Sequence, residues 1–330
     1  MNEIKNIRTG VVGVGSMGQN HARIYSEISN LVGVADPNEE QGKLVAERFG
    51  VKWYKDYREL EGLIDAVTIA VPTSYHYPVA KHFIKNGTHV LVEKPLAGNI
   101  DEAIKIVDLA KESNIILAVG HIERHNGVIR KLKNMLDDSL LGDIITLSAR
   151  RFSPYPSRIT DVGVLFDLTI HDVDIICHLI QSPVISVYAT GVKSRNNNFE
   201  DHINFIMKFA NGSIGMCETS WLTPNKVREL SLVSTKCYGK LDYLKQEIEL
   251  SSSVHGDLDF SNLYQQDSEH LNNKIIIKGE EPLLSEIRDF LDSIKDENSP
   301  LTTGLDGLNA VKIVSAGADS LRTKKSINLK

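Results

Sequence analysis

The sequence predicts an α/β protein with two parts. The first part is an N-terminal doubly wound parallel sheet, and the second is a C-terminal α+β domain with a large open, mostly antiparallel sheet. Three observations lead to this prediction: apolar runs alternate with helical patterns in the first third of the chain, a glycine-rich turn follows the first run, and strand-like runs dominate the second half. A chain of 330 residues is long enough for two domains, which we place at residues 1–121 and 122–330.

The first part contains five apolar runs that are bounded by turn residues and separated by helical patterns. The runs cover residues 10–14, 31–35, 66–71, 89–92 and 115–119, and the helical patterns cover residues 17–29, 39–49, 79–86 and 100–113. This alternation is typical of a parallel sheet with helices on both faces, because strands covered on both sides are apolar throughout. Such sheets bind their ligands at the carboxyl ends of the strands.

A glycine-rich turn joins the first apolar run to the first helix. It reads Gly13-Val14-Gly15-Ser16-Met17-Gly18. Glycines at these positions permit a tight turn and let a pyrophosphate approach backbone N–H groups at the start of the helix. Asp36 ends the second run, where a carboxylate accepts hydrogen bonds from ribose hydroxyls and repels a 2′-phosphate. The pattern predicts a dinucleotide site that prefers NAD to NADP; a turn that merely packs strand on helix is the alternative.

The third apolar run ends in Val71-Pro72-Thr73-Ser74, just before a helix with His76 in its first turn. Thr73 or Ser74 either caps that helix or lines the cofactor groove together with Val71 and Pro72. His76 is either a structural histidine or part of the same groove.

The fourth apolar run ends abruptly in Glu93-Lys94-Pro95. A residue that precedes proline is kept out of helical conformation, so Pro95 holds Lys94 extended at the carboxyl end of the strand. We expect this end to border the nicotinamide. Glu93 either contacts the nicotinamide ribose or balances the charge of the lysine.

The second half predicts an open sheet with a few helices. Helices are expected at residues 127–136, 165–180, 283–295 and 306–322, and strands at residues 144–151, 184–192, 202–209, 213–221, 228–234 and 239–243. Asn211-Gly212 and Tyr238-Gly239 predict turns, and the polar stretch 251–273 predicts a long loop. An open sheet has to cover its second face. We therefore expect a homodimer or homotetramer through this sheet.

Composition excludes several classes of protein. Apolar residues make up 42% of the chain and charged residues 24%, and the net charge of −6 argues against bulk nucleic-acid binding. The first residues lack the apolar core of a signal peptide, and no apolar run approaches the ~20 residues of a membrane span. The three cysteines form no CxxC pair, which indicates reduced thiols. We expect a cytoplasmic protein with no metal site and no nucleic-acid or membrane partner.

Residues 167–174 read DLTIHDVD inside a helical pattern. Asp167 and His171 are four residues apart and therefore share a helix face, which Asp174 extends. A histidine has an ordinary pKa of about 6.5 and suits general-base catalysis, and a carboxylate one turn away can orient its ring. The alternative is an acidic helix face with a capping or salt-bridged histidine.

Three arginines precede this helix: Arg150, Arg151 and Arg158, with Tyr155 among them. Guanidinium groups match the geometry of a diphosphate, and a tyrosine can stack on a uracil ring. Surface salt bridges are the alternative use of these residues.

Taken together, these segments resemble the glucose–fructose oxidoreductase / inositol dehydrogenase family (Gfo/Idh/MocA). The matching segments are GVVGVGSMGQNHA, VPTSYHYPVA, VEKPLA, GHIERHN, VLFDLTIHDVD and TTGLDGLNAVKIVSAGADS. The resemblance implies a Rossmann domain, a second α+β domain, and reversible oxidation of a sugar or polyol hydroxyl with a nicotinamide cofactor. Carried over by position, it makes Lys94 the catalytic-site lysine, Asp167 its companion carboxylate and His171 the base.

Within the family, GHIERHN and the segment from Arg150 to Asp174 resemble UDP-N-acetylglucosamine 3-dehydrogenases most. This implies a UDP-sugar substrate that is oxidised at its 3-hydroxyl, with Arg124 and Asn126 facing the substrate. The sequence departs from the family at Gly163, where several glycines are usual, and at His125 and Gly127, where Phe and Pro are common. These departures concern substrate contacts.

Two other functions stay open. One is an inositol or free-sugar dehydrogenase of the same family, and the other is a non-catalytic NAD-binding regulator. A regulator would keep the glycine turn but has no need for Lys94, Asp167 and His171 together.

Overall fold

A computed structural model describes residues 4–156, 163–195, 198–253 and 270–329. It divides into two compact units, one of residues 1–125 and 280–315 and one of residues 126–279 and 316–330. The predicted fold class is confirmed, because a parallel six-stranded sheet is followed by a mostly antiparallel nine-stranded sheet. Among the helices of the described residues, none is both long and apolar enough to cross a bilayer.

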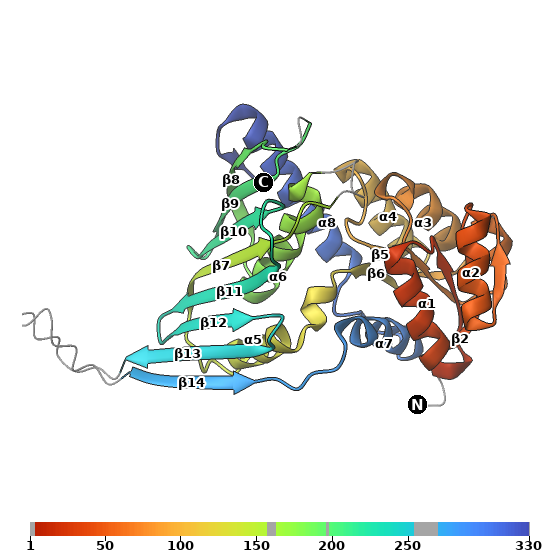
Figure 1. The fold of residues 1–330 in the computed structure, drawn as a ribbon, viewed down its shortest axis with the longest axis horizontal. Helices are drawn as coiled ribbons and strands as arrows, with labels where there is room; N and C mark the ends of the chain where they lie inside the picture. The colour runs from red at the N-terminus through yellow and green to blue at the C-terminus, as the bar shows by residue number, and fades with distance from the viewer. Residues whose placement is uncertain (1–3, 157–162, 196–197, 254–269, 330) are drawn as a thin grey trace, which may run out of the picture. The chain divides into compact units, whose positions relative to one another are not determined.

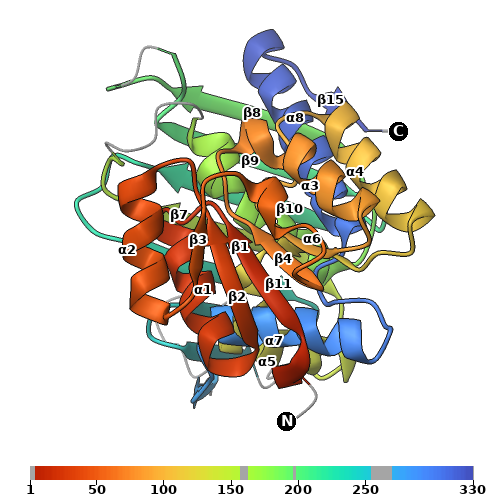
Figure 2. The ribbon, with the colours of Figure 1, turned by 90° about the vertical axis from the view of Figure 1, so that its right-hand side faces the viewer.

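The first unit is built on a parallel sheet with the strand order β3-β2-β1-β4-β5-β6. Figure 2 labels its strands β3, β2, β1 and β4. Its strands are β1 (Arg8–Val12), β2 (Asn30–Ala35), β3 (Lys52–Tyr54), β4 (Ala66–Ile69), β5 (His89–Glu93) and β6 (Leu117–Gly120). Five of them coincide with the predicted runs, and β3 is an additional edge strand. The strand order reverses direction between β1 and β4, which is where doubly wound sheets bind their ligands.

Helices cover both faces of this sheet. They are α1 (Ser16–Ile28), α2 (Glu39–Phe49), α3 (His76–Lys85), α4 (Ile100–Glu112) and α7 (Pro282–Lys295). Adjacent strand residues point to opposite faces, so Val11 packs with α1, α2 and α7 and Val12 packs with α3 and α4. Both valines are almost fully buried, as expected for a sheet covered on both sides.

Helix α7 belongs to the first unit, whereas the predicted boundary assigned everything after residue 121 to the second domain. Its residues Leu283, Ile287 and Phe290 are buried in the same apolar cluster as α1 and α2. This long-range packing explains the difference, because an amphipathic helix does not indicate in its own sequence which sheet it will cover.

The second unit is built on a nine-stranded sheet with the order β14-β13-β12-β11-β7-β10-β9-β8-β15 (Figure 1). Its strands are β7 (Ile144–Phe152), β8 (Val184–Val192), β9 (His202–Phe209), β10 (Ile214–Ser220), β11 (Val227–Ser234), β12 (Tyr238–Asp242), β13 (Glu247–Ser253), β14 (His270–Ile276) and β15 (Ile327–Asn328). Only the pair β7–β10 is parallel.

Helices pack on one face of this sheet. They are α5 (Gly127–Asp137), α6 (Ile170–Ile180) and the last part of α8 (Gly304–Thr323). A Cβ at Gly215 of β10 would lie 2.7 Å from Ile176 of α6, and a Cβ at Gly317 of α8 would lie 2.2 Å from Phe205 of β9. These close approaches place both helices against the same sheet face.

Two local predictions in the second unit were wrong. The two ends of the expected loop at residues 251–273 are strands, since residues 251–253 belong to β13 and residues 270–273 to β14, which pair antiparallel. The part of this prediction that falls on residues 254–269 lies outside the described residues. Tyr238-Gly239 does not form a turn but begins β12. The predicted turn at Asn211-Gly212 does connect β9 to β10, and Gly212 adopts a φ of 92° there.

Candidate active site

The glycine turn forms an open cradle at the end of β1. Gly13 has a φ of 84°, and a Cβ there would lie 2.7 Å from the carbonyl oxygen of Ala70. A Cβ on Gly18 would lie 1.8 Å from the carbonyl oxygen of Gly13, so both positions require glycine. At Gly15 a Cβ would meet nothing within 4 Å. This is the open space at a helix N-terminus that a dinucleotide pyrophosphate requires, so the residues present fit NAD.

Asp36 is held at the cradle by two backbone N–H groups. Its Oδ2 accepts from Val14 N at 2.8 Å, and its Oδ1 accepts from Asn38 N at 2.8 Å. The side chain is half-buried. Because each carboxylate oxygen has a second lone pair, Asp36 can still accept a ribose hydroxyl. The carboxylate is thus already in place beside the glycine turn.

His76 is buried between two backbone carbonyls, as expected for a structural histidine. It is 1% exposed, with Nδ1 2.8 Å from the carbonyl oxygen of Pro95 and Nε2 2.9 Å from that of Val71. Burial lowers the pKa of His76, against the opposing effect of these carbonyls and of Glu93. A neutral ring donates from only one nitrogen, so it can bond only one of these two carbonyls at a time. Cofactor contact by His76 remains a prediction.

The predicted helix cap at Thr73 or Ser74 is not formed. A 3₁₀ turn spans Thr73–Tyr75, and neither it nor α3 has a side-chain hydrogen bond at its N-cap. Cofactor contact by Val71, Pro72, Thr73 and Ser74 remains a prediction.

Lys94 follows the last residue of β5, and its side chain is half-buried. The Lys94–Pro95 peptide is cis. Glu93 is 8% exposed; its Oε1 lies 2.9 Å from His21 Nε2, and its Oε2 accepts the Lys94 N–H at 3.1 Å. Burial on its own would raise the pKa of Glu93, but the His21 hydrogen bond, the charges of His21 and Lys94 and the Lys94 amide together lower it. Glu93 is therefore a buried, charged carboxylate next to the lysine.

Asp167 and His171 lie where a π-helical turn leads into α6. The π-helix covers Leu165–Thr169, and α6 starts at Ile170. Short π-helical turns are rare and frequently occur at functional sites. Asp167 and His171 are both half-buried, whereas Asp174 is 2% exposed and lies within the core. Both side chains of the pair are thus partly accessible, which a general base requires, and their catalytic role remains a prediction.

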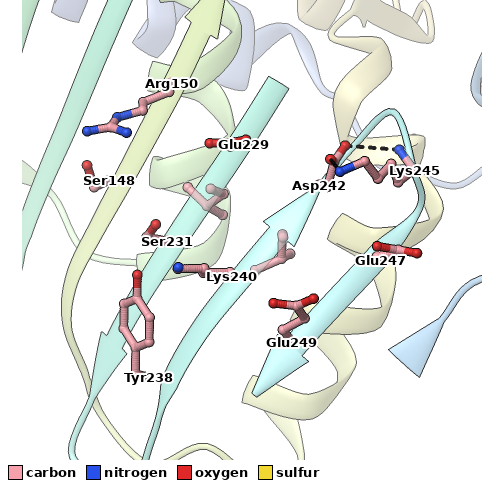
Figure 3. Close-up of a pocket in the computed structure, with 12 residues that line it drawn as sticks. Ser148, Arg150, Glu229, Ser231, Tyr238, Lys240, Asp242, Lys245, Glu247 and Glu249 are labelled. Carbon is pink, nitrogen blue, oxygen red and sulfur yellow. Dashed lines mark hydrogen bonds and ion pairs between the residues drawn. The ribbon is translucent and has the colours of Figure 1, made fainter. Parts of the chain in front are cut away.

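The arginines before α6 differ in their surroundings. Arg151 is 3% exposed, and its Nη2 lies 2.9 Å from Asp172 Oδ1 on α6. Arg150 lies on the opposite sheet face, beside Glu218 at 3.2 Å and among polar side chains that line a depression of about 420 Å³ (Figure 3). Alternation along β7 causes this separation. Arg150 therefore has the surface salt bridge that was the alternative to substrate contact.

The other predicted substrate residues have structural contacts of their own. Arg124 pairs with Asp306 at 3.0 Å and donates to the Leu301 carbonyl at 3.1 Å. Asn126 caps α5 by accepting from Val128 N. The Tyr155 ring packs edge-on against Trp221 at a centroid distance of 5.9 Å. Arg158 lies outside the described residues. Substrate contact by Arg124, Asn126, Arg151, Tyr155 and Arg158 remains a prediction.

His21 is the functional candidate that the sequence reasoning missed. It stands three residues after the last glycine of the turn, inside the segment GVVGVGSMGQNHA, and is fully buried. Its partner Glu93 is 72 positions away along the chain. The only available signal was a histidine on the inner face of α1 and a carboxylate at the end of an apolar strand, since both have to find a polar partner when buried.

Protein-family models match segments in both units of the chain. Residues 7–121 match the oxidoreductase family with an NAD-binding Rossmann fold, and residues 129–238 match the Gfo/Idh/MocA C-terminal domain. UDP-N-acetylglucosamine 3-dehydrogenase from Acidithiobacillus ferrooxidans is 30% identical over 92% of this chain and 93% of that protein. Myo-inositol 2-dehydrogenase from Thermotoga maritima is 25% identical over 98% of both chains.

Solved structures show the same fold. A structure of the Acidithiobacillus ferrooxidans enzyme gives a TM-score of 0.86 with 27% identity, over 96% of this chain and 98% of that one. Levoglucosan dehydrogenase in complex with NADH and levoglucosan gives a TM-score of 0.88 with 20% identity, over 98% and 99% of the two chains. With its glycine cradle, its two sheets and these relatives, the chain belongs to the Gfo/Idh/MocA family of NAD-binding oxidoreductases.

Proposed function

We propose that this protein is an NAD-dependent dehydrogenase that oxidises a ring hydroxyl of a sugar, namely the 3-hydroxyl of a UDP-N-acetylhexosamine. The observation that carries the proposal is the position of Lys94. It follows β5 directly, in a sheet whose β1 end forms the glycine cradle beside Asp36. Ligands of doubly wound sheets bind along this carboxyl edge.

In the proposed reaction a base removes the hydroxyl proton, and the carbinol hydrogen leaves as hydride. NAD, when bound, supplies the hydride acceptor. His171 takes the proton, and Asp167 orients its ring and stabilises the imidazolium. Lys94 donates a hydrogen bond to the reacting oxygen and stabilises the negative charge that develops there.

NAD is the proposed cofactor instead of NADP. Asp36 is fixed beside the cradle, and Glu39 and Glu40 follow it at the start of α2. A 2′-phosphate at this position would meet the carboxylate of Asp36, which repels it.

A UDP-N-acetylhexosamine is proposed as the substrate over a free sugar or an inositol. The relative named for UDP-N-acetylglucosamine is 30% identical over 92% of this chain. An inositol 2-dehydrogenase from Rubrobacter xylanophilus is 30% identical over only 66% of the chain, and the Thermotoga maritima enzyme is 25% identical over 98%. The cytoplasmic location expected from the sequence remains a prediction.

A substrate panel tests the proposal. Purified protein with NAD is offered UDP-N-acetylglucosamine, UDP-glucose, N-acetylglucosamine, glucose and myo-inositol, and NADH formation is followed by absorbance. We expect turnover with UDP-N-acetylglucosamine and little with the free sugars. Faster turnover of myo-inositol would support the inositol dehydrogenase instead. NAD binding without turnover of any compound would support the regulator.

Two variants connect the activity to the proposed residues. His171→Ala is expected to lower kcat by about 10²–10⁴-fold, the usual effect of losing a general base. Lys94→Ala removes the oxyanion donor and is expected to lower kcat by roughly 10²-fold or more with NAD binding retained. Lys81→Ala, an exposed lysine of α3, serves as the matched control. Wild-type turnover by Lys94→Ala would contradict the assigned role.

We also propose that a second copy of the chain covers the outer face of the nine-stranded sheet. One row of cross-strand neighbours on this face runs from the apolar Tyr188, Ile206 and Met216 through Ser148 and Ser231 to Lys240 and Glu249. Tyr188, Ile206 and Met216 are 38%, 44% and 36% exposed. Both charge signs occur at the other end of the row, so two such faces can pair their charges around a two-fold axis.

Light scattering after size-exclusion chromatography tests this interface. A dimer or tetramer is expected for the wild type, and Met216→Glu is expected to give a monomer because it buries a charge in the apolar part of the face. Leu44→Glu, at an exposed leucine of α2, is the control. A monomeric wild type would contradict the proposal.

A further inference from the structure

A chain of buried hydrogen bonds lies behind the strand end that carries Lys94. His21 Nε2 lies 2.9 Å from Glu93 Oε1, and His21 Nδ1 lies 3.3 Å from the hydroxyl of Thr68. The Thr68 hydroxyl lies 2.8 Å from the hydroxyl of Tyr25. Glu93 Oε2 accepts the backbone N–H of Lys94 at 3.1 Å. Helix α1 and strands β4 and β5 are thus connected to the lysine through one carboxylate.

The direction of the central hydrogen bond follows from the charge of Glu93. The surroundings lower the pKa of this carboxyl even though burial opposes ionisation, so Glu93 is ionised at neutral pH and can only accept. The ring of His21 therefore donates from Nε2. Its Nδ1 exchanges a hydrogen bond with Thr68 in either protonation state of the ring.

Packing of the sheet alone does not explain this buried hydrogen-bond network, because apolar side chains would fill the same space. Tyr25, Thr68 and His21 are fully buried, and an ionised carboxylate next to them costs free energy that an apolar side chain would not. The backbone also leaves room for the carboxylate. A Cβ on Gly120, the β6 neighbour of Glu93, would lie 2.8 Å from Oε2. The orientation of Glu93 therefore depends on two features: the hydrogen bonds to its carboxylate and the missing side chain at Gly120.

We propose that His21 and Glu93 are positioning residues for Lys94. The hydrogen bond from His21 fixes Oε1 of Glu93, so that Oε2 holds the Lys94 amide and with it the backbone from which the ammonium extends. The inference rests on the proposed function of Lys94 as the oxyanion donor. A displacement of about 1 Å in such a group can cost roughly 10²-fold in rate, so remote support of this kind affects turnover.

Three variants test the positioning role by kinetics. His21→Leu removes the donor, and His21→Gln keeps an N–H near the place of Nε2. We expect kcat to fall roughly 10- to 100-fold in His21→Leu, with the KM for NAD unchanged, and to be largely restored in His21→Gln. Thr68→Val removes the hydroxyl that supports His21 and is expected to lower kcat to a smaller extent. A histidine with only a packing role would affect stability in these variants without this rescue.

Thr9→Val is the matched control for Thr68→Val. Thr9 is also fully buried, on the neighbouring strand β1, and its hydroxyl lies 2.9 Å from that of Ser29. Both substitutions remove one buried hydroxyl from the same sheet and should cost similar stability. Only Thr68→Val should change kcat. If Thr9→Val, Thr68→Val and His21→Leu all have the same kcat, the inference is overturned.

Hydrogen exchange of the Lys94 amide provides a readout that does not require activity. Without the His21 hydrogen bond, Glu93 is free to rotate away from the Lys94 amide. Exchange at this amide should then become roughly tenfold faster in His21→Leu and remain slow in His21→Gln and Thr9→Val. Unchanged exchange in His21→Leu would overturn the inference. If the wild type oxidises no compound of the panel, the proposed function fails, and the exchange data still decide whether His21 and Glu93 hold Lys94.

Discussion

The buried ion pair between Arg151 and Asp172 allows a test of whether Arg151 stabilises the fold or contacts the substrate. The two side chains are 4% and 2% exposed, and two guanidinium nitrogens of Arg151 lie 2.9 Å from Asp172 Oδ1. Arg151→Met leaves the charge of Asp172 in a buried site. Removing one partner of such a pair typically costs about 3–5 kcal/mol, which changes the unfolding equilibrium by roughly two to four powers of ten.

The double variant Arg151→Met/Asp172→Leu removes both charges at once and completes a double-mutant cycle. Replacing both charges by apolar groups of similar size is often neutral or stabilising, so this variant should recover most of the lost stability. We expect Asp172→Leu alone to destabilise as strongly as Arg151→Met. The difference between the single and double variants gives the coupling free energy.

Urea unfolding can be followed in the second unit alone. The chain has two tryptophans, Trp53 in the first unit and Trp221 in the second, where it is 1% exposed. In a Trp53→Phe background the fluorescence of Trp221 reports on the second unit, which avoids treating two units as one transition. If Arg151→Met unfolds at the wild-type urea concentration and only raises the KM for the sugar, the residue is a substrate contact and the reasoning is refuted.

Three further predictions concern the first unit. Gly15→Ala should retain wild-type stability, because a Cβ there meets only open space, but it should lose NAD affinity in calorimetry, because that space is where the pyrophosphate binds. Gly18→Ala should melt at a lower temperature, because its Cβ overlaps the Gly13 carbonyl. Asp36→Ser should increase the ratio of kcat/KM for NADP to that for NAD, and an unchanged ratio would contradict the role of its charge. Glu93→Gln should be less stable than the wild type above pH 4.5, because the pKa of Glu93 in the folded state is lowered below its ordinary value of 4.5. The stability advantage of the wild type should be lost as the pH falls further, and a stability difference that persists at the lowest pH would contradict this.

The sequence was sufficient for features that depend on local pattern. Five parallel strands were predicted because each is a continuous apolar run, and the glycine turn because its backbone geometry excludes other residues. Strand β3 was missed because it has only three residues. The pairing of β13 with β14 was missed because their polar residues have low strand propensity and form strands by pairing with neighbours.

Contacts between distant segments account for the remaining differences. The burial of His76 between the carbonyls of Val71 and Pro95 could not be predicted, because these carbonyls come from two different strand ends. The hydrogen bond between His21 and Glu93 and the packing of α7 on the first sheet likewise depend on the folded chain. The π-helical turn before α6 has no signal in the hydrophobic pattern.

The most direct test of the proposed chemistry is the fate of the hydrogen on carbon 3 of the sugar. The protein is incubated with NAD and UDP-N-acetylglucosamine that carries deuterium at carbon 3, and the reduced cofactor is analysed by mass spectrometry. We predict reduced cofactor that contains one deuterium, and unlabelled NADH from substrate deuterated at carbon 4. Unlabelled NADH from the 3-deuterated sugar, or no reduced cofactor at all, would contradict the proposal that this protein oxidises the 3-hydroxyl of a UDP-N-acetylhexosamine.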